Sequence, residues 1–213
     1  MMFTSWRPAG KWVRAREWRT PAAKLEVAYI RKSSAVVTVS DQLASRLNEI
    51  YGVRPLVIYN TPRSECLAPA GRHVRDDLKL GPETPLAVHT GQIASSRDIE
   101  RFLHQMPRVP DLHFALVGMA NKRMAARLGN WLELDISARV HFVPPVPYDD
   151  VSPYISSASF GVVPAVAASE SQIVAAPGKL FEMMFAGLPV LMADMPQRRS
   201  MLERYGEGVI FPS

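Results

Sequence analysis

The stretch from Ala175 to Met195, AAPGKLFEMMFAGLPVLMADM, predicts the fold because it contains a loop, a helix and a buried strand in succession. Pro177 and Gly178 break the chain and open the helix, and Gly187 ends it. Leucine and methionine recur between them at helical spacing, so one face of the helix is expected to be buried. The apolar run that begins at Pro189 is typical of a strand covered on both sides.

The same alternation of short apolar strands and helices runs through the second half of the chain. Strands are expected at residues 85–90, 113–117, 139–143, 159–163, 189–193 and 208–211, with helices between them. This pattern predicts an α/β fold with a doubly wound parallel sheet and helices on both faces.

A shorter series of helix, strand, helix and strand precedes this region, over residues 1–60. The Pro- and Gly-rich stretch 61–84 predicts a linker, although a long surface loop within one domain is the alternative. We therefore expect a partial α/β unit over 1–60, a linker over 61–84 and a Rossmann-like domain over 85–213.

The composition is that of a soluble globular protein. Hydrophobic residues make up 47% of the 213-residue chain and charged residues 21%. No apolar run approaches the roughly 20 residues that a membrane-spanning helix needs. Cys66 is the single cysteine, which excludes an internal disulfide framework and favours a cytoplasmic setting.

The net charge of +5 comes from the N-terminal segment. Residues 1–32 carry eight basic and two acidic side chains, whereas the rest of the chain carries 17 and 18. Trp6, Trp12 and Trp18 interleave with these basic side chains, but their spacing places them on three faces of a helix. Three roles fit this segment: a solvated or partner-facing surface, peripheral contact with the inner face of an anionic membrane, and contact with nucleic acid. Of these, we do not expect a nucleic-acid partner.

Two cations, Arg97 and Lys179, are expected in the first turns of helices, where the helix dipole disfavours positive charge. In parallel α/β sheets, ligands bind beyond the carboxyl ends of the strands, next to helix N-termini. The two cations therefore predict a diphosphate site at this edge, and solvated surface charge is the alternative. Glu182 could pair with Lys179 at the surface, for about 0.2–0.5 kcal/mol, or accept hydrogen bonds from a ribose diol.

Several familiar motifs are missing from the sequence. It contains no Walker loop, no G-x-G-x-x-G, no G-x-S-x-G elbow and no cluster with metal-ligand spacing. A nucleoside triphosphatase, a standard dinucleotide enzyme and a serine hydrolase are therefore not expected.

Three segments resemble retaining glycosyltransferases of the GT-B fold, namely those similar to glycosyltransferase family 4, also called glycosyl transferases group 1. AVVTVSDQLASRLNEIYGVRPLVIYNTP (35–62) is similar to the end of that family's N-terminal domain. VHTGQIASSRDIERFL (88–103) resembles the Gly-rich loop that opens its donor-binding domain, and APGKLFEMMFAGLPVLMAD (176–194) resembles its Lys/Glu helix and the following strand. The chain thus resembles a donor-binding half that carries the tail of an acceptor half.

The resemblance implies transfer of a sugar, with retention, from a nucleoside diphosphate sugar to a glycan, lipid-linked or small-molecule acceptor in polysaccharide biosynthesis, without a metal ion. It makes Glu182 the ribose ligand, and Arg97 and Lys179 the catalytic cations at the diphosphate. The implied nucleotide-sugar site comprises Gly91, Arg97, Gly118, Val143, Pro144, Pro177, Gly178, Lys179 and Glu182.

Because few strands precede the linker, we expect a partner chain or a homo-oligomer. A non-catalytic nucleotide-sugar-binding module, or the donor subunit of a split transferase, is the alternative function.

Overall fold

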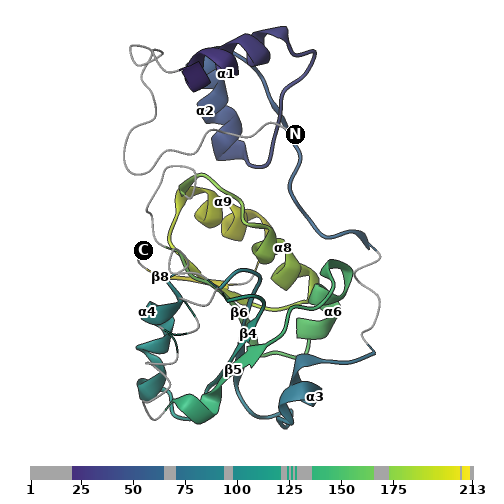
Figure 1. Ribbon diagram of the computed structural model, residues 1–213, viewed down its shortest axis with the longest axis vertical. Coiled ribbons are helices and arrows are strands. Elements are labelled where there is room, and N and C mark those ends of the chain that lie inside the picture. The colour runs from purple at the N-terminus through teal and green to yellow at the C-terminus, as the bar shows by residue number, and fades with distance from the viewer. Residues whose placement is uncertain are drawn as a thin grey trace.

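The computed structural model describes residues 21–64, 71–93, 98–120, 124, 126, 128, 136–165, 173–206 and 208–211. Within them, six parallel strands form the main sheet in the order β5-β4-β3-β6-β7-β8 (Figure 1). Their bounds are Leu86–Thr90 (β3), His113–Val117 (β4), Val140–Val143 (β5), Phe160–Val163 (β6), Val190–Ala193 (β7) and Gly208–Phe211 (β8). The predicted fold class is confirmed, and every predicted strand of this sheet agrees with the structure to within one residue.

Helices cover both faces of this sheet (Figure 1). The described α-helices of this region are Val74–Leu78 (α3), Ile99–Leu103 (α4), Val151–Ile155 (α6), Gly178–Phe185 (α8) and Pro196–Tyr205 (α9), and its short 3-10 helices are Met106–Arg108, Ser137–Arg139 and Tyr148–Asp150. Buried side chains of α3, α6, α8 and α9 join one apolar cluster, whereas those of α4 join another with Met124 and Leu128. The sheet therefore has a core on each face, as its largely apolar strands predict.

The helix α8 lies close to the sheet because the residue of β6 that it packs against, Gly161, has no side chain. Leu180, Phe181 and Met183 are buried, as the helical spacing predicts. A Cβ atom at Gly161 of β6 would lie only 2.3 Å from the sulfur of Met183. Gly187 follows the helix with a left-handed φ of 71°, so the chain reverses there and enters β7.

Part of the predicted linker packs against the sheet domain. Val74, in α3, is fully buried in its core. The Arg75 guanidinium donates hydrogen bonds to the carbonyls of Gly81 and Thr84, at 2.8 Å each. The Tyr154 hydroxyl donates to Asp77 at 2.7 Å, and this bond is the main reason why the pKa of Asp77 is lowered. The sequence pattern indicates only a linker here and does not indicate α3.

The N-terminal part contains Pro21–Lys32 (α1), Val37–Thr38 (β1), Asp41–Tyr51 (α2) and Leu56–Val57 (β2). β1 and β2 pair in parallel, and α2 contacts both strands. Ser40 caps α2 by accepting a hydrogen bond from the Leu43 amide, and Gly52 ends the helix with a left-handed φ of 68°. The predicted order of helix, strand, helix and strand is present.

This N-terminal part contacts the sheet domain through α2, which lies beside α9 (Figure 1). The Ser40 hydroxyl donates to the carbonyl of Val174 at 2.6 Å, and the Gln42 amide donates to the Gln197 side chain at 3.0 Å. The ring centroids of Tyr59 and Phe181 are 5.3 Å apart, so the segment after β2 reaches α8.

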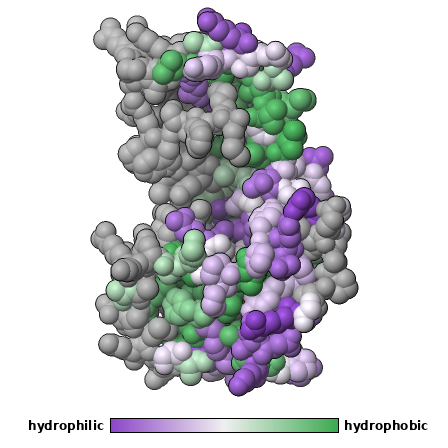
Figure 2. All heavy atoms as spheres, turned by 45° about the vertical axis from the view of Figure 1, so that its right-hand side comes forward, coloured by the Kyte–Doolittle hydropathy of each residue, from purple (hydrophilic) through white to green (hydrophobic). Residues whose placement is uncertain are grey.

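One face of the β1–β2 pair is apolar and exposed. Val37, Val39, Leu56 and Ile58 are between 42% and 60% exposed, whereas Thr38 between the first two is buried. Side chains two residues apart share a face, and Val37 is in register with Leu56, so these four form one surface, the N-terminal apolar face. Figure 2 shows apolar residues gathered over this part of the molecule.

The spacing of Leu25, Ala28 and Tyr29 predicts an apolar stripe along α1. Leu25 and Tyr29 are exposed, whereas Ile30 is buried. The predicted helix is present, but a different face of it packs against the protein. No helix among the described residues is long and apolar enough to cross a membrane. The three tryptophans of the basic segment lie outside the described residues, so its partner stays a prediction.

Candidate nucleotide-sugar site

The strand order reverses between β3 and β6, and doubly wound sheets bind ligands beyond the carboxyl ends of strands at such a point. The two strands are registered only through Ala87 with Phe160 and Val88 with Gly161. Past this register the carboxyl end of β3 continues with His89 and Thr90, which are both buried. The sheet therefore places polar side chains at the switch point.

The loops that follow β3, β4 and β5 meet at this edge. The Gly91 amide donates to the carbonyl of Val117 at 2.8 Å, and the Gly118 amide donates to the carbonyl of Val143 at 3.0 Å. A Cβ atom at Gly118 would lie 1.8 Å from the Gly91 carbonyl oxygen, so the two loops touch backbone to backbone. Gly91 is exposed and has a left-handed φ of 84°. Three predicted residues, Gly91, Gly118 and Val143, are thus brought together, with an open backbone surface at Gly91.

The helix α8 begins at the same edge. Pro177 precedes the helix in an extended conformation, and Gly178 is the first helical residue, one position later than the sequence indicates. A Cβ atom at Gly178 would lie 3.3 Å from the side-chain nitrogen of Asn60, so the end of the N-terminal part reaches the start of this helix. The first-turn amides of a helix point toward its N-terminus and favour anions there.

Lys179 does not extend into solvent from the first turn of α8. Its ammonium group lies 2.7 Å from the carbonyl oxygen of Thr90 and 3.1 Å from Nε2 of His89. The positive charge is therefore held at the carboxyl end of β3, beside Gly91. The expected conflict with the helix dipole is explained in part by these two acceptors on the neighbouring strand.

Glu182 lies one turn further along α8, on the same side. Its carboxylate accepts a hydrogen bond of 2.6 Å from the Thr90 hydroxyl, and its side chain is half-buried. Thr90 therefore contacts both predicted site residues of the helix, Lys179 through its carbonyl and Glu182 through its side chain. A carboxylate with a fixed orientation and a fixed ammonium group stand together at the switch point.

Sequence reasoning missed His89 and Thr90. A signal was available, because a histidine and a threonine close a strand that is otherwise apolar, LAVHT. His89 is fully buried, and its Nδ1 lies 2.9 Å from the carbonyl oxygen of Val162 in β6.

Other predicted residues do not join the cluster in the same way. Pro144 is exposed in the turn after β5. Arg97 falls outside the described residues, so its role stays a prediction. Two further basic side chains, in the first turn of α9, are not among the predicted site residues. Arg199 forms an exposed ion pair with Asp194, whereas Arg198 is buried and donates to the carbonyl of Val163 at 3.1 Å. Among the described residues, no three His, Cys, Asp or Glu side chains form a group that could hold a metal ion.

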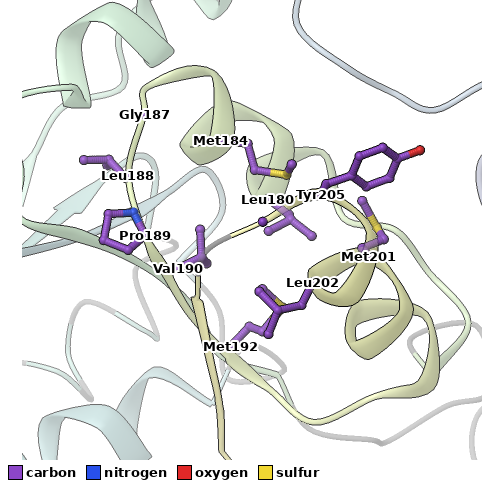
Figure 3. A pocket seen from close by; sticks show the side chains of 11 residues that line it. Leu180, Met184, Gly187, Leu188, Pro189, Val190, Met192, Met201, Leu202 and Tyr205 are labelled. Atoms are coloured by element: carbon purple, nitrogen blue, oxygen red, sulfur yellow. The ribbon is translucent and has the colours of Figure 1, made fainter.

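A separate pocket of about 190 Å³ lies between α8, β7 and α9 (Figure 3). Met184, Met192, Met201, Leu202 and Tyr205 contribute to its lining, and Figure 3 shows their side chains around it. It includes Gly187, Leu188 and Pro189 at the amino end of β7, which is the edge opposite the polar cluster. None of the predicted site residues that the structure describes lines it, so we place the candidate site at the polar cluster.

Comparison with solved structures supports the fold. Sucrose-phosphate synthase from Thermosynechococcus elongatus is similar with a TM-score of 0.68 at 19% identity, over 94% of this chain and 51% of that one. Anabaena HepE in complex with UDP and glucose has a TM-score of 0.68 at 16% identity, over 93% and 55%. The catalytic domain of starch synthase IV from Arabidopsis thaliana, bound to ADP and acarbose, has a TM-score of 0.60 at 13% identity, over 88% and 47%.

The chain thus spans about half the length of the solved structures it matches. No curated protein matches its sequence. The model of the family called glycosyl transferases group 1 matches residues 84–213, which is more than half of the chain and contains the whole six-stranded sheet. The chain belongs to the glycosyl transferases group 1 family, and its six-stranded sheet domain has the fold of a Rossmann-like half of a GT-B glycosyltransferase.

Proposed function

We propose that this chain is the donor-binding part of a glycosyltransferase. In this proposal it binds a nucleoside diphosphate sugar, and the sugar passes with retention to a glycan, lipid-linked or small-molecule acceptor in polysaccharide biosynthesis. The observation that carries the proposal is the cluster of Lys179, Glu182 and Thr90 beside Gly91, at the switch point of the sheet. The solved complexes of HepE with UDP and of starch synthase IV with ADP support this class of ligand.

Each group has a part in this proposal. The diphosphate lies over Gly91, where the exposed backbone allows close approach, and next to the Lys179 ammonium group and the N-terminus of α8. Glu182 accepts hydrogen bonds from the ribose diol, and the Thr90 hydroxyl fixes its carboxylate for this purpose. Negative charge develops on the leaving diphosphate during transfer, so a fixed cation stabilises the transition state more than the ground state. Arg97 is proposed as a second cation at the same phosphates.

We propose that donor binding needs no metal ion, because these cations and the helix N-terminus supply the positive potential. Chelation with EDTA should then leave nucleotide affinity unchanged, and a loss that magnesium restores would contradict this part.

A second candidate is a donor subunit that depends on another chain for its acceptor site. The N-terminal apolar face favours it, because an exposed sheet face of four aliphatic side chains is typical of an interaction surface. In that case the chain binds nucleotide but transfers no sugar alone.

Thermal unfolding with added UDP, ADP, GDP and their glucose derivatives tests the proposal. At about 100 times the dissociation constant a ligand stabilises the folded state by about 2.7 kcal/mol, which for a chain of this size raises Tm by roughly 5–11 °C. The nucleosides without phosphates are the control, and they should give a much smaller shift. The absence of any shift with all the diphosphates would contradict donor binding, and binding without release of nucleotide from the sugar derivative would favour the donor-subunit candidate.

A further inference from the structure

The buried side chain of His89 connects three elements of the candidate site. It lies at the carboxyl end of β3, where the register with β6 has ended. Its Nδ1 faces the carbonyl oxygen of Val162 in β6 at 2.9 Å, and its Nε2 faces the Lys179 ammonium group of α8 at 3.1 Å. One imidazole therefore joins the two strands of the switch point to the proposed diphosphate cation.

These two neighbours determine the protonation of the ring. A carbonyl oxygen only accepts hydrogen bonds, so Nδ1 must carry a proton. An ammonium group only donates, so Nε2 must carry a lone pair. Lysine is ordinarily much the more basic of the two, so the positive charge of the pair belongs to the amine and the ring is neutral. The carbonyl of Val162 thus orients the ring so that its acceptor nitrogen points at Lys179.

We propose that His89 is a positioning residue that holds the Lys179 ammonium group at the diphosphate. A lysine side chain has four rotatable bonds and loses rotamer entropy when it is fixed. The Thr90 carbonyl supplies one acceptor, and the imidazole supplies a second from the adjacent residue of the same strand. Two acceptors on a rigid strand define one position of the amine before the donor binds, which favours preorganised phosphate binding.

A purely structural role, in which His89 only bridges β3 and β6, makes different predictions for two conservative variants. His89→Asn keeps a donor at the position of Nδ1 for Val162 but has no acceptor near the position of Nε2. His89→Gln places its amide oxygen near the position of Nε2 and can still accept from Lys179. A structural role is preserved by Asn, whereas the positioning role is preserved by Gln.

The first measurement requires no nucleotide. The full chain is treated with limiting acetic anhydride, and acetylation of Lys179 is followed by mass spectrometry relative to the exposed Lys79. We expect His89→Asn to raise the relative rate at Lys179 several-fold and His89→Gln to restore the wild-type rate. Equal rates in wild type and His89→Asn would overturn the proposal.

The second measurement rests on the proposed function. Calorimetric titration with UDP, or with ADP if that nucleotide binds wild type more tightly, should show affinity reduced roughly tenfold in His89→Asn and near wild type in His89→Gln. In the Lys179→Met background, His89→Asn should cause no further loss, because coupled residues are not additive. An equal loss in both backgrounds would overturn the positioning role. Lys179→Met with unchanged affinity would instead contradict the proposed diphosphate site, while the acetylation rates still decide the contact between His89 and Lys179.

Discussion

Replacement of Gly118 by alanine tests the backbone contact on which the site is built. The new Cβ atom would lie 1.8 Å from the Gly91 carbonyl oxygen, whereas contacts below 3.0 Å are essentially never found at a real Cβ atom. The Gly91 carbonyl would therefore have to retreat by about 1.2 Å. Both loops are held by hydrogen bonds of their amides to the ends of β4 and β5, at 2.8 and 3.0 Å, so the movement must stretch these bonds as well.

The cost follows from these contacts and from the φ of 155° at Gly118, which residues with a side chain rarely adopt. Overpacking of a tightly packed site costs about 1–3 kcal/mol, and weakened backbone hydrogen bonds add about 1 kcal/mol. We therefore expect Gly118→Ala to lower the free energy of unfolding by about 2–4 kcal/mol, which for a chain of this length lowers Tm by roughly 4–16 °C. Because Gly91 has to move, nucleotide affinity should also fall.

Urea unfolding followed by circular dichroism measures this change, and Gly206→Ala is the matched control. A Cβ atom at Gly206 has no neighbour within 4 Å, and its φ of 176° is an ordinary extended value. The control should stay within about 0.5 kcal/mol of wild type. If Gly118→Ala were equally harmless, the loops after β3 and β4 would not be in contact and the site would be built differently.

Thr90→Val removes the hydroxyl that orients Glu182 and should lower the free energy of unfolding, measured in urea, by about 1–2 kcal/mol, whereas Thr90→Ser should keep the wild-type value. Identical unfolding midpoints for the wild type and both variants would show that this hydrogen bond contributes nothing to stability. Burial lowers the pKa of His113 and of His141 below the ordinary value of 6.5, and the two neutral rings form a hydrogen bond. The stability that the neutral pair contributes is therefore present above about pH 6.5 and is lost as the pH falls toward the lowered pKa values. Urea midpoints at about pH 7.5 and about pH 5 should differ less in His141→Gln than in wild type, and an equal difference would contradict this origin. The N-terminal apolar face should cause self-association or capture of a partner chain, so light scattering should give a mass above that of the monomer, and Ile58→Ser should reduce this mass. A wild-type protein that is purely monomeric would count against an interaction surface.

The sheet could be predicted from the sequence because each of its strands is a short apolar run between turn residues, and this pattern requires burial on both faces. The helix α3 could not be predicted in this way. It has five residues, VRDDL, of which Val74 is the first, and it forms because that side chain enters the core while Asp77 accepts the Tyr154 hydroxyl. Such contacts join residues far apart in the chain, so local pattern carries no trace of them.

In the candidate site, too, some residues could be predicted from local sequence and others could not. Lys179 could be predicted because a positive charge is unusual in the first turn of a helix, and Glu182 could be predicted because it matches a family pattern. Their contacts with Thr90 and His89 were not predicted, since these depend on the place of β3 beside β6 in the strand order. Arg198 illustrates the reverse case. An arginine is ordinarily expected at the protein surface, but this side chain is buried and donates to the Val163 carbonyl at the end of β6.

Whether Glu182 holds the ribose of a nucleoside diphosphate is measured most directly by calorimetric titration of wild type and Glu182→Gln. The ligands are UDP and dideoxy-UDP, which lacks both ribose hydroxyls, or the adenine pair if wild type prefers it. Glutamine keeps an acceptor for the Thr90 hydroxyl but loses the charge, so UDP affinity should fall roughly tenfold while the affinity for the dideoxy ligand is the same in both proteins. An equal loss for both ligands, or no loss for UDP, would contradict the assignment of Glu182 to the donor ribose.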